Sequence, residues 1–136
     1  MFGVYLAGTI EGVKVFESSL LGHGFRSAGL CLPGIGIFVG QGTFSIDRHT
    51  VMHEYGHILQ ARIIGIISFY IIIGSMSLIS AWTKGFARGH QLYWTESWSN
   101  YLAKEYFQKH YGIIWDDYRF PPTNISEQTL KWIIWK

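Results

Sequence analysis

The N-terminal part of the chain alternates short apolar runs with glycine-containing turns, a pattern typical of β-strands. Residues 2–10 and 13–16 are rich in branched and aromatic side chains, and Glu11-Gly12 between them predicts a tight turn. Farther along, residues 35–39 and 43–46 are separated by three residues that include two glycines, which predicts a second hairpin. We therefore expect a small β-sheet at the N-terminus.

Two later stretches place apolar residues at helical spacing. The first runs from about residue 47 to residue 64 and stops before Gly65. The second runs from Thr95, whose hydroxyl is expected to cap the helix, to about residue 110. A sheet followed by helices predicts an α+β fold, and a length of 136 residues predicts one domain over residues 1–136.

Between the two predicted helices, residues 63–83 carry no charged side chain. A stretch of this length can span a bilayer, which requires about 20 apolar residues. The run is interrupted by glycines and serines, however, and a hairpin bent near Gly74-Ser75 fits the pattern as well. Both interpretations, a membrane segment and a buried helical hairpin, remain open from this pattern alone.

Composition strengthens the case for apolar contacts. Charged residues make up 15% of the chain and hydrophobic residues 49%, whereas charged residues usually account for about 25%. The surplus of apolar residues predicts contact with lipid, a partner or an apolar ligand. A net charge of +2 from scattered basic residues argues against nucleic-acid binding. The single Cys31 and the lack of a basic N-terminal leader favour a cytoplasmic or membrane-associated protein.

The sequence His53-Glu54-Tyr55-Gly56-His57 is the most specific chemical signal in the chain. On a helix, two histidines four positions apart stand on one face, one turn apart. Their imidazole nitrogens can then bind one Zn²⁺ at about 2.0–2.1 Å. Glu54 would lie beside the ion, where its carboxylate can take a proton from a bound water. The motif predicts one zinc per chain, with His53 and His57 as ligands and Glu54 as the general base.

A catalytic zinc needs a third protein ligand, and the second predicted helix offers Glu96. Glu96 and Asn100 are four positions apart, so they share one helical face. The Glu96 carboxylate can bind the metal, and the Asn100 amide oxygen can accept a hydrogen bond from the Nδ1–H of a ligand histidine. The alternative is that Glu96 is a first-turn acidic residue favoured by the helix dipole.

Residues 53–60 and 94–100 together resemble the gluzincins, zinc metallopeptidases with H-E-x-x-H and a downstream Glu. In that group the second segment usually reads N-E-x-x-S-D, and Asn100 here replaces the Asp. The spacing between His57 and Glu96 is also longer than in the best-known members. The resemblance implies a zincin-like α+β fold, with a sheet over the metal helix and a Glu-bearing helix behind it. It also implies hydrolysis of peptide bonds in peptide or protein substrates.

Sharing one metal between the histidines and Glu96 constrains residues 63–83. A single span across about 30 Å of hydrocarbon would put the ligands on opposite sides of the membrane. The segment is therefore expected to fold back on itself, and it can still contact a membrane in that form. If an edge strand lies next to the metal, an extended peptide can add to it. The alternative function is a zinc-binding, membrane-associated interaction module with weak or no catalysis. The donor that stabilises the oxyanion is not fixed by the sequence, and the candidates are His90, Tyr93, His110, Tyr111 and Tyr118.

Overall fold

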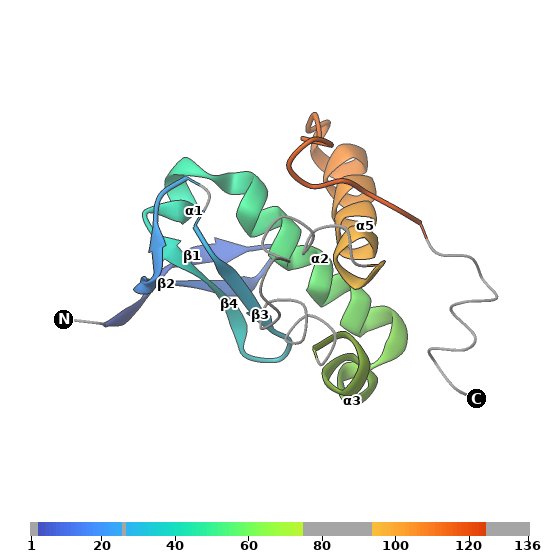
Figure 1. Ribbon diagram of the computed structural model, residues 1–136, viewed down its shortest axis with the longest axis horizontal. Coiled ribbons are helices and arrows are strands. Elements are labelled where there is room, and N and C mark those ends of the chain that lie inside the picture. Colours follow the sequence, from blue (N-terminus) through green and yellow to red (C-terminus); the bar gives the residue numbers. More distant parts are fainter. Residues whose placement is uncertain (1–2, 26, 75–93, 125–136) are drawn as a thin grey trace, which may run out of the picture. The chain divides into compact units, whose positions relative to one another are not determined.

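A computed structural model of the chain describes residues 3–25, 27–74 and 94–124 (Figure 1). The chain divides into two compact units, Met1–Ile58 and Leu59–Lys136. The first unit contains a small sheet and the second contains helices, so the protein is α+β, as predicted. The boundary between the units falls inside the helix that carries the H-E-x-x-H motif.

The sheet of the first unit has four strands: β1 (Val4–Ile10), β2 (Val13–His23), β3 (Gly29–Leu32) and β4 (Gly36–Gln41). Their order is β1-β2-β4-β3. The pairs β1–β2 and β3–β4 are antiparallel, whereas β2 and β4 are parallel. Within the described residues β1 and β3 are therefore the two edge strands (Figure 1).

The first predicted hairpin is confirmed. Ile10 pairs with Val13 across the turn, and Glu11 and Gly12 both have positive φ angles of 50° and 80°. Two positive φ angles are what a type I′ turn requires, and this turn matches the twist of paired strands. Strand β2 continues well beyond the predicted end at residue 16 and supplies the centre of the sheet.

The second predicted hairpin is wrong. Residues Thr43–Ile46 form a short helix, α1, instead of a strand. Gly42 turns the chain with a φ of 82°, and the N–H groups of Gly42 and Phe44 donate to the buried Glu17 carboxylate at 3.0 and 2.8 Å. Because these N–H groups bond to Glu17 of β2, they are not available for pairing with a neighbouring strand. A local sequence pattern does not reveal such a contact. The antiparallel partner of β4 lies upstream instead, in β3.

The helices are α2 (Arg48–Ile64), α3 (Ile66–Ser68), η1 (Phe69–Gly74) and α5 (Trp94–Tyr111). Helix α2 matches the predicted helix at both ends, and it stops before Gly65, which has a φ of 93°. A positive φ of this size is costly for residues with a Cβ, so glycine ends the helix here.

The predicted cap of the second long helix is wrong, because Trp94, the residue before Thr95, already belongs to α5. Thr95 therefore lies inside the first turn and is fully buried. Within the described residues, its hydroxyl has no hydrogen-bond partner. A side chain in this position cannot cap the helix that it belongs to.

The second unit has its own apolar core, formed by five buried residues from α2, η1 and α5: Ala61, Ile64, Phe69, Ile73 and Trp98. Gln60 of α2 donates from Nε2 to the Thr95 carbonyl at 2.6 Å. After α5 the chain returns along it, since the Thr123 N–H donates to the Ser97 carbonyl at 3.0 Å. These contacts fix the C-terminal half of α2 against α5.

The apolar run at residues 63–83 is described only as far as Gly74. This part is helical, and several of its isoleucines face solvent. Among the described helices, none has the length and apolar character needed to cross a membrane. The predicted bend at Gly74-Ser75 and the rest of the run extend outside the described residues.

Candidate metal centre

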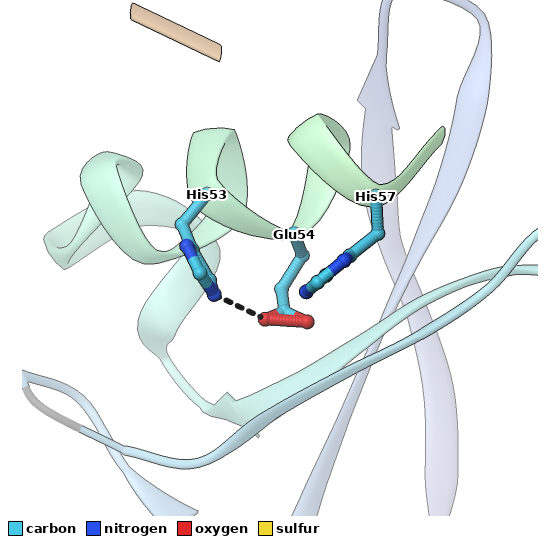
Figure 2. Close-up of side chains that lie close together, drawn as sticks. All are labelled: His53, Glu54 and His57. Carbon is cyan, nitrogen blue, oxygen red and sulfur yellow. Dashed lines mark ion pairs between the residues drawn. The ribbon is translucent and has the colours of Figure 1, made fainter. Parts of the chain in front are cut away.

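Three residues of the predicted metal centre form a buried cluster on α2. His53, Glu54 and His57 are buried, with 3%, 5% and 5% of their surfaces exposed. Each offers a ligand atom, and these atoms lie within 4.8 Å of one another. Figure 2 shows the three side chains projecting from one side of the helix, toward the strands drawn below it. The structure thus brings together the two predicted ligands and the predicted base.

The geometry within the cluster suits a small cation. The His53 Nε2 and Glu54 Oε2 atoms are 3.5 Å apart. The Glu54 carboxylate thus lies next to a ring nitrogen that could bind a metal ion. The His53 and His57 rings lie 5.3 Å apart at an interplanar angle of 80°, so neither stacks on the other. Their nitrogens can therefore approach one ion from two directions.

The donor set also fits a divalent transition ion chemically. Imidazole and carboxylate groups are common ligands of zinc, and imidazole alone suits several neighbouring metals. Burying a carboxylate is costly unless a positive charge or hydrogen bonds compensate it. A cation held by His53 and His57 beside the Glu54 carboxylate would add to that compensation. These three buried residues could hold a metal ion, and its identity as zinc is a proposal.

Strand β3 approaches this cluster at its first residue. A Cβ added at Gly29 would lie 3.0 Å from the Cγ, Cδ and Oε2 atoms of Glu54. The backbone of an edge strand is therefore packed against the predicted base. The sequence does not predict this contact, because it joins two segments that lie 25 positions apart in the chain. The apolar run Leu30-Cys31-Leu32 directly after Gly29 was the available signal for a strand.

The predicted third ligand and its partner lie in the second unit. Glu96 and Asn100 are on the first turns of α5, with 2% and 0% of their surfaces exposed. Asn100 donates from Nδ2 to the Pro121 carbonyl at 3.1 Å. This bond sets the orientation of the Asn100 side-chain amide, with Nδ2 toward Pro121. The ligand role of Glu96 and the orienting role of Asn100 stay predictions.

Comparisons with protein-family models, with curated proteins and with solved structures find no match for this chain. The likeness to gluzincins therefore consists of the motif itself and of the buried cluster that it forms. The α+β order of sheet and helices is observed, whereas the finer zincin-like assignment belongs to the proposal below.

The predicted oxyanion donors stay unassigned. His90 and Tyr93 fall outside the described residues. Tyr111 and Tyr118 are exposed, with 59% and 92% of their surfaces accessible, and both lie in the second unit. The exposed His110 ring lies 4.4 Å from the Tyr106 ring on the same helix. These placements give no reason to prefer one donor over another.

Proposed function

We propose that this protein is a zinc-dependent peptidase in which His53 and His57 hold the metal and Glu54 is the general base. The observation that carries the proposal is the buried cluster of two imidazoles and one carboxylate on one side of α2. Glu96 is the proposed third ligand, and Asn100 is proposed to orient a ligand histidine. One zinc per chain is expected.

The residues of the cluster have complementary tasks. His53 and His57 would hold the zinc, which would provide a Lewis acid for the scissile carbonyl and lower the pKa of a bound water. Glu54 lies beside His53, with 3.5 Å between Oε2 and Nε2, where it can accept a proton and pass it to the leaving nitrogen. Burial of all three side chains favours the proposal, because electrostatic interactions are stronger where water is excluded.

The position of β3 favours a peptide as the substrate. Within the described sheet, β3 pairs on one side only, with β4. Its other edge can receive an extended peptide through backbone hydrogen bonds. Because Gly29 packs against Glu54, a peptide added at that edge would run close to the base. The order of sheet, metal helix and Glu-bearing helix also supports a zincin-like fold as part of the same proposal.

The test is the substitution Glu54→Gln, which keeps the shape of the side chain but removes the base. Loss of a general base usually costs about 10²–10⁴ in rate, so hydrolysis of a mixed fluorogenic peptide library should fall by at least about 10²-fold while zinc content is retained. Glu105→Gln, the same change at an exposed residue of α5, is the matched control and should keep the native rate. Full activity in Glu54→Gln would overturn the mechanism.

A second candidate function is a zinc-binding module that docks on a membrane surface and has little or no catalysis. Four isoleucines near the end of α2 and just after it are spaced by one to four positions and face solvent: Ile63, Ile66, Ile67 and Ile71 are 42%, 51%, 76% and 66% exposed. The exposed Arg62 stands at the start of this isoleucine face. Apolar residues bordered by a basic residue suit an anionic lipid surface.

The membrane candidate predicts sedimentation of the protein with anionic phospholipid vesicles. The double change Ile67→Ser and Ile71→Ser should abolish this binding, whereas Ile114→Ser, at a residue that is 89% exposed elsewhere, should leave it intact. Vesicle binding by zinc-loaded native protein that cleaves no peptide in the library would favour the module over the peptidase. No difference between native protein and the double variant would exclude the isoleucine face.

A further inference from the structure

We propose that Gly29 is a positioning residue for Glu54. The lack of a side chain at position 29 lets the Glu54 carboxylate lie against the backbone of β3, and this contact determines where the carboxylate sits. The consequence for catalysis rests on the proposed peptidase function. The placement of Glu54 by Gly29 does not, because it follows from contacts in the metal-free protein.

The contact is close and involves the functional end of the side chain. A Cβ at Gly29 would be 3.0 Å from three Glu54 atoms, namely Cγ, Cδ and Oε2. Favourable contacts between non-bonded carbon atoms are about 3.5–4.0 Å. A methyl group at this position would therefore push the carboxylate by a few tenths of an ångström. The three nearest atoms all belong to Glu54, so the push is directed at the base.

The strand has little freedom to move away instead. Gly29 pairs with Val39 of β4, and the ladder continues to the pair between Leu32 and Gly36. Val39 is fully buried in the sheet. Shifting the first residue of β3 would break this pairing or disturb a close-packed core. The carboxylate of Glu54 must then give way.

The substitution Gly29→Ala tests the contact with Glu54 and does not strain the backbone at position 29. Gly29 is not among the glycines with positive φ, so its conformation is open to alanine without strain. Replacing glycine by alanine at such a position usually stabilises a protein, because the unfolded chain loses entropy. Any loss of stability in Gly29→Ala therefore reports the clash with Glu54.

The first arm of the experiment is a double-mutant cycle on metal-free protein, read by thermal unfolding. Gly29→Ala should lower the Tm of the native background by about 3 °C. In the Glu54→Ala background, where the clash is gone, the same change should leave the Tm unchanged or raise it. Gly3→Ala is the control, since a Cβ there meets nothing within 4 Å, and its effect should be the same in both backgrounds.

The second arm uses the zinc-loaded protein. Misplacing a catalytic group by about 1 Å can cost about 10²-fold in rate, so the smaller shift in Gly29→Ala should lower kcat by roughly 10-fold. Bound zinc should stay unchanged, because no ligand histidine atom is among the nearest contacts. A global structural defect would instead change kcat, KM and zinc content together.

The two arms separate the failure of this inference from the failure of the proposed function. Equal Tm shifts in both backgrounds would overturn the role of Gly29, whatever the activity. Coupling without any peptide hydrolysis by native protein would support the placement of Glu54 by Gly29 and overturn the peptidase. Coupling with an unchanged kcat would show that the position of Glu54 does not set the rate, and would overturn the positioning role.

Discussion

Glu17 is a buried carboxylate in the middle of β2, with 4% of its surface exposed. It accepts hydrogen bonds from the Tyr5 hydroxyl at 2.5 Å and from the N–H groups of Gly42 and Phe44. Burial raises the pKa of Glu17, but the hydrogen bonds from Tyr5 and the two backbone N–H groups together lower it by more. The pKa of Glu17 therefore lies below its ordinary value. One side chain thereby ties β1, β2 and the start of α1 together.

This lowered pKa predicts a specific loss of stability in acid. A group whose pKa is lower in the folded state stabilises the fold above its unfolded pKa, about 4.3 for Glu, and loses that contribution as the pH falls through the folded pKa. The free energy of unfolding of native protein, measured in urea, should therefore fall steadily as the pH drops below about 4.3. Glu17→Gln should cost about 1–2 kcal/mol at pH 7 and flatten the slope. Equal slopes in Glu17→Gln and native protein would contradict this role.

At the same scale, the motif residues were predictable and their surroundings were not. The spacing of His53 and His57 places them on one helical face by geometry alone, and the structure buries them with Glu54 as one cluster. The contact of Glu54 with Gly29 joins two segments that are distant in sequence. No local pattern encodes such a contact, because it depends on how β3 pairs with β4.

The long helices were the elements best predicted from sequence. Helix α2 has apolar residues at helical spacing and ends before Gly65, and both signals are local. Helix α1 was missed because the alternating residues 43–46 resemble a strand, whereas hydrogen bonds to the distant residues Gly24 and Glu17 hold the start of this segment. The parallel pairing of β2 with β4 was also beyond prediction, since it joins strands that are not consecutive.

The hydrogen bond between α2 and α5 predicts how much their contact contributes to stability. Gln60 is fully buried and donates to the Thr95 carbonyl at 2.6 Å. Gln60→Leu should lower the free energy of unfolding by about 1–3 kcal/mol, because the buried hydrogen bond to the Thr95 carbonyl is lost. Thr95→Val is the matched control at the same contact. Within the described residues its hydroxyl has no partner, so this change should cost little. A larger loss for Thr95→Val than for Gln60→Leu would contradict the assignment.

At the scale of the whole molecule, two units share one helix. The motif histidines lie in the first unit and Glu96 in the second, and α2 contributes residues to both. The prediction of a single domain over residues 1–136 stays a prediction. The apolar surplus seen in the composition is partly accounted for by exposed isoleucines of the second unit, such as Ile67 and Ile71. Lipid contact through this face stays a proposal.

The central claim is that His53 and His57 hold one zinc, and its most direct test is metal content. Purified native protein, His53→Ala, His57→Ala and His49→Ala are dialysed against the same zinc buffer and measured by elemental analysis. His49 lies one turn before His53 and is only partly buried, so it is the control. We expect about one zinc per chain in native protein and His49→Ala, and nearly none in the two motif variants, because catalytic sites have three protein ligands. Equal zinc content in all four proteins, or no zinc in native protein, would contradict the claim.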